Sequence, residues 1–238
     1  MLDDDQRKNF SGVIRSNADR MQVIINDLRD IARIDADQMN VAPIPITIQS
    51  IVEETLKAYQ PHIEAKEQTL VNNIPDDTPL ILADKIRLIQ VLINLISNAT
   101  KYSPEGSTIT LSTIVEDYHR NEAGDRIGPA LRLSVKDDGM GMSEDDLQKL
   151  FRVRYFRSEE ARNSQQPGTG LGMMITQDII NKHNGTIWVE STLGEGTTFH
   201  FAIPLAPEEP DEDGKNPSTD ETAQHKVADK KAVDVDGD

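Results

Sequence analysis

The stretch Arg87-Leu-Ile-Gln-Val-Leu-Ile-Asn94-Leu-Ile-Ser-Asn98-Ala-Thr-Lys101-Tyr102-Ser103 is the most informative part of the chain. Its many apolar residues predict a buried helix. Asn94 and Asn98 are four residues apart and share one face of that helix, which Lys101 extends. Two amides are costly to bury without partners. A neutral oxygen ligand suits Mg²⁺, which keeps waters and phosphates as its other ligands. The pattern predicts a polar site on an otherwise apolar helix.

Two glycine clusters follow this helix. The first is Asp137-Asp138-Gly139-Met140-Gly141-Met142, directly after an expected strand, and the second is Gly168-Thr169-Gly170-Leu171-Gly172, which opens an expected helix. Glycine lets the backbone approach a ligand closely, and the N–H groups at a helix start attract phosphate. The patterns G-x-G-x-x-G and G-x-x-x-x-G-K-[ST] are both missing, so a Rossmann or P-loop site is disfavoured. Each cluster taken by itself is equally compatible with a simple turn.

The remaining periodicity predicts an α+β fold, a two-layer α/β sandwich in which helices cover one face of a mixed sheet. Ser50 and Glu53 form an expected capping box at the start of one helix, and Asp84 is the expected N-cap of the central helix. The expected strands are 44–48, 69–73, 80–83, 109–118, 131–135, 186–190 and 197–204, and the expected helices are 50–66, 84–99 and 172–183.

The first forty residues predict one long helix with a heptad seam, in which apolar residues repeat in steps of four and three. The seam consists of Phe10, Ile14, Asn17, Met21, Ile24, Leu28 and Ile31. Pro43 and Pro45 separate this helix from the next element. The narrow stripe predicts a coiled-coil-like helix that pairs with another helix, either a further N-terminal helix or a second subunit. An amphipathic helix that lies on its own domain is the alternative.

The composition limits the partners of the chain. It has 238 residues, with 25 Lys and Arg against 41 Asp and Glu, and a formal net charge of −16. This charge disfavours nucleic acids and anionic membranes, which require a basic face. Because the sequence has no cysteine, it excludes a disulfide framework and a thiolate metal site. We expect no contact with nucleic acid and no membrane contact in this segment.

The acidic residues are concentrated at the C-terminal end, where residues 206–238 include 11 acidic and 4 basic residues. A segment with so few large apolar residues cannot offset the entropy cost of ordering, which predicts a disordered acidic tail. A solvated tail and an acidic docking tail are both compatible with this composition. The expected organisation is a helix over 1–40, a mixed α/β domain over 41–205 and the tail over 206–238.

Four motifs together resemble the ATP-binding catalytic domain of sensor histidine kinases, which belongs to the nucleotide-binding superfamily of DNA gyrase and heat-shock chaperone ATPases. The motifs are Asn94-Leu-Ile-Ser-Asn98-Ala-Thr-Lys101-Tyr102, Asp137-x-Gly139-x-Gly141, Gly168-Thr169-Gly170-Leu171-Gly172 and Gly194-Glu-Gly196-Thr197-Thr198-Phe199. Their order and spacing cover residues 84–204. The first forty residues, which end in Leu28-Arg-Asp-Ile-Ala-Arg-Ile-Asp35, resemble the second helix of the dimerisation and phosphotransfer hairpin of that family.

The resemblance implies ATP and Mg²⁺ as cofactors. It implies that Asp137 accepts a hydrogen bond from the adenine amino group, that Asn98 ligates Mg²⁺, and that Arg157 and Lys101 act on the phosphates. A mobile lid is expected over 152–167. The implied ATP-binding residues are Asn94, Asn98, Lys101, Tyr102, Asp137, Gly139, Gly141, Met142, Gly168, Thr169, Gly170, Leu171, Gly172 and Thr197.

Two features depart from the pattern of the family. The segment Phe151-Arg-Val-Arg-Tyr155-Phe156-Arg157 carries one residue more than the family's phenylalanine motif, which puts the reach of Arg157 in doubt. The phosphoacceptor histidine is also missing, and we expect it on a first hairpin helix that precedes this segment in a longer protein. The histidines of the chain, none of which lies in the expected context, are His62, His119, His183, His200 and His225.

The resemblance implies a cytoplasmic protein-histidine kinase that is homodimeric through its N-terminal helix and relays the phosphoryl group to a response-regulator receiver domain. The chain alone is expected not to autophosphorylate. A non-enzymatic ATP-sensing module is the first alternative. An ATP-hydrolysing clamp is the second, and it is disfavoured because such clamps use a glutamate base at the position of Asn94, whose amide accepts no proton from water at neutral pH.

Overall fold

The structure is a computed structural model that describes residues 3–121, 123–163 and 168–207. The chain divides into one unit that ends at Ala206 and a second that begins at Pro207. Apart from residues 206–207, the expected acidic tail lies outside the described residues, so its disorder stays a prediction. The domain boundaries that we expect after residues 40 and 205 also stay predictions.

A five-stranded mixed sheet lies at the centre of the first unit, with the strand order β2-β4-β7-β9-β8. β2 and β4 run parallel, and the other neighbours are antiparallel. Its strands are β2 (Thr69–Asn73), β4 (Thr108–Glu116), β7 (Ala130–Asp137), β8 (Thr186–Thr192) and β9 (Gly196–Pro204). Two small antiparallel pairs join β1 (Ile44–Ile46) with β3 (Ile81–Ala83), and β5 (His119–Arg120) with β6 (Arg126–Ile127).

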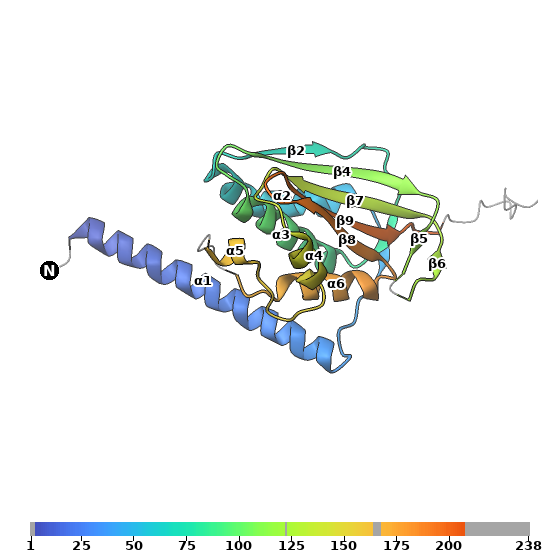
Figure 1. Ribbon diagram of the computed structural model, residues 1–238, viewed down its shortest axis with the longest axis horizontal. Helices are drawn as coiled ribbons and strands as arrows, with labels where there is room; N and C mark the ends of the chain where they lie inside the picture. Colours follow the sequence, from blue (N-terminus) through green and yellow to red (C-terminus); the bar gives the residue numbers. More distant parts are fainter. Residues whose placement is uncertain (1–2, 122, 164–167, 208–238) are drawn as a thin grey trace, which may run out of the picture. The chain divides into compact units, whose positions relative to one another are not determined.

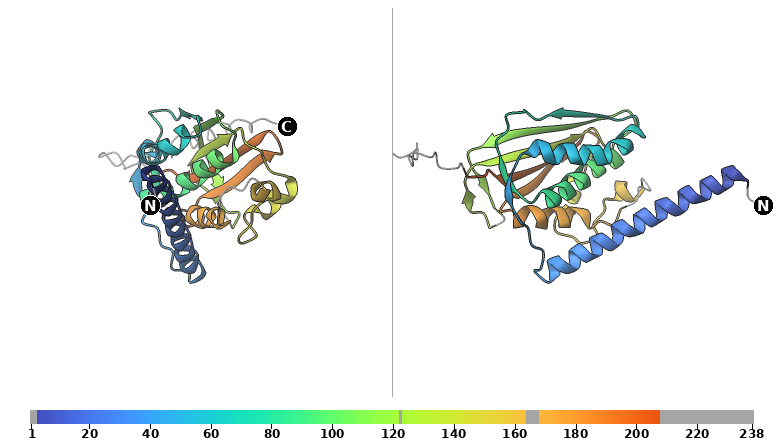
Figure 2. Two further views of the ribbon diagram at one scale, coloured as in Figure 1. Left: turned by 90° about the vertical axis from the view of Figure 1, so that its left-hand side faces the viewer. Right: turned by 180° about the vertical axis from the view of Figure 1, so that it is seen from behind.

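Three helices cover one face of this sheet (Figures 1 and 2). They are α2 (Ile48–Glu64), α3 (Lys85–Tyr102) and α6 (Gly172–Lys182). The short helices α4 (Glu144–Leu150) and α5 (Glu159–Asn163) lie between β7 and α6 in the sequence. The predicted α+β class and two-layer arrangement are therefore confirmed.

The core lies between α3 and the sheet. Leu88, Leu92 and Leu95 of α3 are fully buried, as are Leu133 and Phe201 of the strands. Burying one such side chain stabilises a fold by about 1.5–3 kcal/mol, so this layer fixes how α3 is rotated on the sheet. The rotation leaves the amides of α3 beside α6, where the site forms.

The start of α2 differs from the expectation. Thr47 is the N-cap: its hydroxyl accepts a hydrogen bond from the backbone N–H of Ser50 at 3.4 Å, and the Ser50 hydroxyl donates to the Thr47 carbonyl at 2.9 Å. The predicted capping box of Ser50 and Glu53 is therefore wrong, because a threonine in extended conformation supplies the capping oxygen earlier in the chain. For the same reason the first strand ends at Ile46 rather than at residue 48.

Two further expectations are corrected. α3 continues to Tyr102 instead of ending near Ala99, and the N–H of Ser103 closes its last turn on the Ala99 carbonyl. His119, expected in a loop, lies in β5. Its two ring nitrogens lie 3.3 Å from the Gly128 carbonyl oxygen and 2.6 Å from that of Asn184, which secures the β5–β6 pair to the turn after α6.

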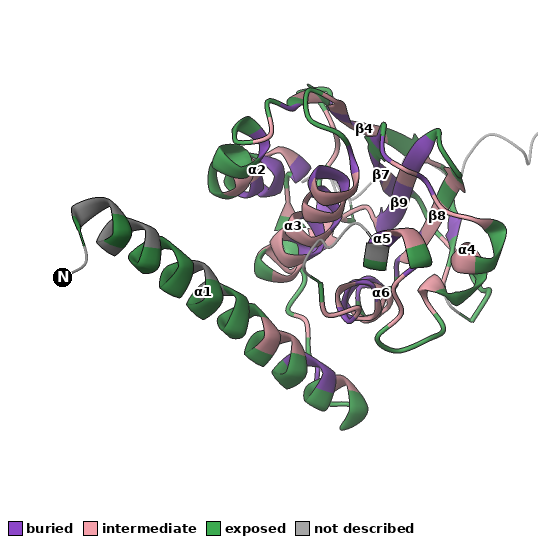
Figure 3. Cartoon of the chain, turned by 60° about the vertical axis from the view of Figure 1, so that its left-hand side comes forward, coloured by how far each residue is buried: buried purple, intermediate pink, exposed green. Residues whose placement is uncertain are grey.

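Asp3 is the N-cap of the long helix α1 (Asp4–Asp35), and its carboxylate accepts a hydrogen bond from the backbone N–H of Gln6. Its C-terminal end packs on the domain, with Ile31 only 7% exposed, whereas Ile14 and Met21 are 68% and 62% exposed (Figure 3). The seam thus has one end buried on its own domain and a longer part that is uncovered. Within the described ranges, no helix combines the length and apolar character needed to cross a membrane.

Candidate functional site

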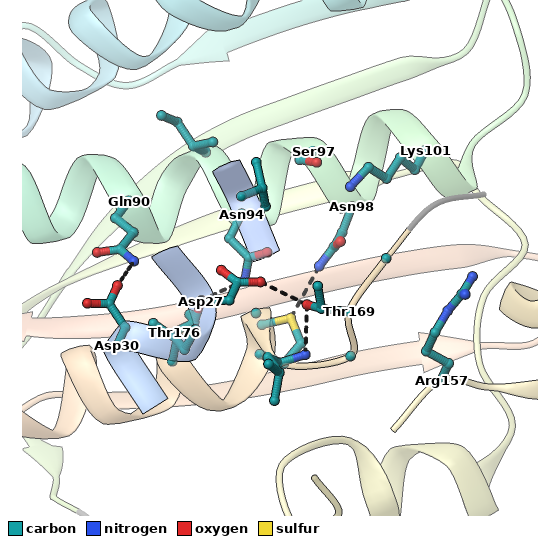
Figure 4. Close-up of a pocket in the computed structure, with 18 of the residues that line it drawn as sticks. Asp27, Asp30, Gln90, Asn94, Ser97, Asn98, Lys101, Arg157, Thr169 and Thr176 are labelled. Atoms are coloured by element: carbon teal, nitrogen blue, oxygen red, sulfur yellow. Dashed lines mark hydrogen bonds between the residues drawn. The ribbon is translucent and has the colours of Figure 1, made fainter. Parts of the chain in front are cut away.

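The amides of α3 project towards α6 (Figure 4). The Asn94 side chain donates a hydrogen bond to the Thr176 hydroxyl at 2.7 Å, and the Asn98 NH₂ group contacts the Met173 sulfur at 3.3 Å. Each amide therefore has a partner on α6, which meets the cost of placing it on an apolar helix. Because the NH₂ group of Asn98 is engaged, its carbonyl oxygen is the atom suited to a cation.

The second glycine cluster allows α6 to approach α3. A Cβ atom at Gly172 would lie 2.5 Å from the Asn94 side-chain oxygen, so a larger residue would displace the Asn94 amide from its place beside α6. Gly170 has a φ of +73° and faces the backbone of Tyr155, which again excludes a side chain. The Thr169 hydroxyl accepts the N–H of Leu171 at 3.2 Å. That N–H group is therefore occupied, whereas the N-cap residue Leu171 provides no side-chain cap for the N–H groups of the first turn of α6, which an anion could bind.

Asp137 ends β7 and is 5% exposed. Burial raises the pKa of its carboxyl group from 3.8 to about 6, although hydrogen bonds from the backbone N–H groups of Gly139 and Thr197 favour the ionised form. The Gly139 N–H donates to the carboxylate at 2.9 Å. A Cβ atom at Gly139 would lie 2.6 Å from that carboxylate, and one at Gly141 would lie 1.9 Å from the Thr192 carbonyl oxygen. The backbone of the first glycine cluster therefore packs closely against the buried Asp137 carboxylate and against Thr192.

Lys101, in the last turn of α3, lines the same cavity as these amides. Burial lowers the pKa of its ammonium group, an effect that nearby Asp27 opposes. Asp27 belongs to α1 and accepts a hydrogen bond from the Thr169 hydroxyl at 2.8 Å (Figure 4). Burial in turn raises the pKa of Asp27. A carboxylate at this point has the same sign of charge as a phosphate, so a phosphate at Thr169 would require this contact with Asp27 to open.

Asp30 of α1 extends this contact. It accepts a hydrogen bond from the Gln90 side chain at 2.8 Å and lies 3.5 Å from the Arg87 guanidinium. Asp27, Asp30 and Thr176 were missed by the sequence analysis. The sequence around acidic residues on a polar helix face does not show which of them belong to a site, because their partners are set by the packing of α1 on the domain.

Arg157 lies in the segment expected to form a lid. Its guanidinium donates at 2.7 Å to the carbonyl of Ala161, which lies within α5. Tyr155 in the same segment has a φ of +60°. Residues 164–167 of the expected lid lie outside the described residues, so its mobility stays a prediction.

A cavity of about 1310 Å³ joins these groups. The sequence-predicted residues that line it are Asn94, Asn98, Lys101, Tyr102, Asp137, Gly141, Met142, Arg157, Gly168, Thr169, Gly170, Leu171, Gly172 and Thr197. Gly139 does not line it, and its N–H donates to the Asp137 carboxylate. Among the described residues, no group of three or more His, Cys, Asp or Glu side chains could hold a metal ion. A Mg²⁺ ion at Asn98 would therefore take its other ligands from phosphates and water.

Comparison with known proteins agrees with this geometry. Residues 83–207 match the family described as histidine kinase-, DNA gyrase B-, and HSP90-like ATPase. The chain belongs to this family. Within it, the chain is an ATP-binding catalytic domain of the sensor histidine kinase type, preceded by a helix.

Two curated relatives and one solved structure illustrate the relationship. The chain is 36% identical over 197 residues to the sensor protein GacS of Pseudomonas syringae pv. syringae, covering 82% of this chain and 21% of that protein. It is 33% identical over 207 residues to the sensor histidine kinase WalK of Bacillus subtilis (strain 168), covering 85% and 31%. The crystal structure of full-length ShkA in complex with AMPPNP superposes with a TM-score of 0.66 at 25% identity, covering 87% of this chain and 40% of that one. The chain thus spans less than a third of either curated relative.

Proposed function

We propose that this chain transfers the γ-phosphoryl group of ATP to a histidine on a hairpin helix, for relay to an aspartate of a response-regulator receiver domain. The observation that supports this most strongly is the single cavity shared by a buried acid, a cation, two amides and a glycine-rich helix start. These are the groups needed to bind a purine at one end and a magnesium-bound triphosphate at the other.

The purine would be bound by the first glycine cluster. In this proposal Asp137 accepts a hydrogen bond from the adenine amino group, while Thr197 acts through its backbone bond to Asp137. Gly139 allows the backbone to pack against the Asp137 carboxylate, and Gly141, which lines the cavity, leaves room for the base beside it. Tyr102 and Met142, which both line the cavity, would pack against the adenine.

The phosphates would lie between α3 and the start of α6. Asn98 holds Mg²⁺, Asn94 and Lys101 face the phosphates, and Arg157 reaches the γ-phosphate after releasing the Ala161 carbonyl. In the transfer, the bond from the γ-phosphorus to the oxygen of ADP breaks and a bond to the imidazole nitrogen forms. Positive charge near the transferring group is the main source of acceleration in such reactions. The proposed phosphate cradle consists of Gly168, Thr169, Gly170, Leu171 and Gly172.

A transfer experiment tests this proposal. Incubated with labelled ATP and Mg²⁺, the chain should acquire no acid-labile phosphohistidine, because none of its described histidines lines the cavity. His119, His183 and His200 are buried elsewhere, and His62 lies on the surface of α2. His225 lies outside the described residues. A separately added histidine-containing hairpin domain should become labelled, slowly, because its docking is bimolecular.

The control for transfer is the same hairpin domain with its acceptor histidine replaced by glutamine, which should remain unlabelled. ATP binding without transfer to the intact hairpin would favour the ATP-sensing module. Rapid release of inorganic phosphate would favour the hydrolysing clamp. Robust labelling of the chain itself would show that the acceptor has been misassigned.

The proposed role of Asn98 as the protein ligand of Mg²⁺ gives a separate prediction. Asn98→Ala should abolish the Mg²⁺ dependence of ATP binding, because one amide oxygen is the proposed protein ligand and all other ligands come from phosphates and water. ATP titrations by calorimetry with and without Mg²⁺ measure this dependence. Thr176→Val is the matched control, since it removes the partner of the neighbouring Asn94 and should leave the dependence intact. An unchanged Mg²⁺ effect in Asn98→Ala would contradict the assignment.

The proposed partners follow from the same function. The uncovered part of α1 is proposed to form a homodimer, and a receiver domain is proposed to accept the phosphoryl group. A reaction that consumes ATP and serves a receiver domain would take place in the cytoplasm.

A further inference from the structure

The end of α3 poses a hydrogen-bonding problem. The last four carbonyl groups of a helix have no partner within that helix, and a glycine after the helix is a common solution. α3 instead ends at Ser103, which has an extended conformation and precedes Pro104. The carbonyl groups at this end belong to the turn that carries Lys101 and Tyr102, so their partners decide where those two side chains stand.

Lys66, in the turn after α2, supplies most of the missing donors. Its ammonium group donates to the carbonyl oxygens of Thr100 at 2.8 Å, Lys101 at 3.2 Å and Ser103 at 3.1 Å. A lysine has three N–H donors, and here each has a backbone acceptor. The positive charge also lies at the negative end of the α3 dipole, where it is favourable.

Gln68 completes the arrangement. Its side chain is buried, and its NH₂ group lies 3.0 Å from the Pro104 carbonyl oxygen and 3.2 Å from the Ser107 hydroxyl. The backbone joins the same two segments, since Gly106 donates to the Lys66 carbonyl at 3.1 Å. The turn after α2 therefore clamps the turn after α3.

The remaining carbonyl group of this turn connects α3 to the first glycine cluster. The N–H of Met140 donates to the Tyr102 carbonyl at 3.1 Å. A Cβ atom at Gly139 would lie 2.8 Å from that same carbonyl oxygen, so the two segments fit without spare room. A displacement of the end of α3 would therefore move the loop that follows Asp137.

We propose that Lys66, assisted by Gln68, is a positioning residue of the nucleotide site. It holds the last turn of α3 so that Lys101, Tyr102 and the loop after Asp137 keep their relative positions. Lys66 does not line the cavity, so its effect on nucleotide is transmitted through the backbone. This inference rests on the proposed binding of ATP in the cavity.

The test is Lys66→Met, which keeps the length of the side chain and removes its donors. We expect the affinity for ATP, measured by calorimetry well below the melting temperature, to fall roughly three- to tenfold with unchanged stoichiometry. Hydrogen exchange of the peptide that contains Met140 should become faster, because its acceptor on Tyr102 loses its fixed position. Lys66→Arg, which keeps the charge and the donors, should restore much of the affinity.

Lys85→Met is the matched control. Lys85 lies at the other end of α3 and pairs with Glu54 of α2 at 2.7 Å, so the control removes the same charge between the same two helices. It should bind ATP as the unaltered chain does. If Lys66→Met does not fold, Gln68→Met replaces it, with a smaller expected loss of affinity and the same faster exchange at Met140.

The outcomes separate this inference from the proposed function. If the unaltered chain and Lys85→Met bind ATP and Lys66→Met binds it equally well, the positioning role is overturned and ATP binding stands. A lower melting temperature with unchanged affinity would overturn it too, since Lys66 would then serve stability alone. If the unaltered chain binds no ATP, both the proposed function and this inference fail.

Discussion

Asp137→Asn is expected to weaken ATP binding by roughly tenfold to a hundredfold, which corresponds to the loss of a buried hydrogen bond to a charged group. Gly139 and Thr197 already donate to the Asp137 carboxylate. An adenine amino group would be a further donor, and a carboxylate accepts all of them. An amide would turn its own NH₂ group towards one of these donors. For the same reason GTP, whose base has an oxygen where adenine has the amino group, should bind much more weakly than ATP.

The pH dependence of binding should follow the same carboxyl group. ATP needs the ionised form, and the pKa of Asp137 is about 6 in the nucleotide-free protein. Affinity should therefore fall as the pH drops below about 6, by roughly tenfold for each pH unit well below the pKa. Asp137→Asn is the control, because it removes this titration and keeps the protonation of the phosphates themselves. Calorimetry of both proteins between pH 5 and 7.5 isolates the contribution of Asp137.

The contribution of Asp137 to the stability of the nucleotide-free protein should change with pH in the opposite direction. The pKa of Asp137 is higher in the folded state than its ordinary value of 3.8, so the folded state binds more protons between pH 4 and 6. The contribution of Asp137 to stability should therefore decrease as the pH rises through this range, and the difference between the unaltered chain and Asp137→Asn isolates it. Above this range Asp137→Asn should melt no lower than the unaltered chain, because it removes a buried charge. A lower melting temperature in this variant, or equal affinity for ATP and GTP, would assign Asp137 a structural role instead.

The parts of the site that the sequence predicted are those encoded by neighbours in the chain. Two asparagines four residues apart lie on one helix face in any α-helix, and Gly141 and Gly170 have the positive φ values that favour glycine. The helix α3 and both glycine clusters could therefore be placed without knowledge of the tertiary structure. Their meeting in one cavity depended on the resemblance to a family.

The contacts that the sequence could not predict join distant segments. Asp27 and Thr169 are 142 positions apart, and Lys66 and Thr100 are 34 apart. The spacing of the two residues along the sequence does not predict a contact in either pair, because each contact depends on how one element packs against another. The end of α3 was misplaced for this reason: the donors that extend it to Tyr102 come from the turn after α2.

The double substitution Met21→Glu with Leu28→Glu is expected to convert a dimer of this chain into a monomer. The two residues are seven positions apart, on one face of α1, and are 62% and 48% exposed. In a paired helix each would bury apolar surface worth about 1.5–3 kcal/mol, and glutamates there would bring like charges together across the interface. Self-association measured by light scattering and sedimentation should weaken by at least roughly a hundredfold. ATP binding should survive, because Met21 does not line the cavity and Leu28, which lines it from α1, is not among the proposed ATP-binding residues.

Ser11→Glu with Gln22→Glu is the matched control for this experiment. Both residues are neutral and exposed, and they lie on a face of α1 rotated by roughly a quarter turn from the seam. The control adds the same two negative charges to the same helix and should leave the dimer intact. Loss of the dimer in both double variants would mean that charge on α1, and not the apolar seam, governs association. A monomer in the unaltered chain would contradict the pairing of α1, and the exposed seam residues Phe10, Ile14, Met21 and Leu28 would then need another partner.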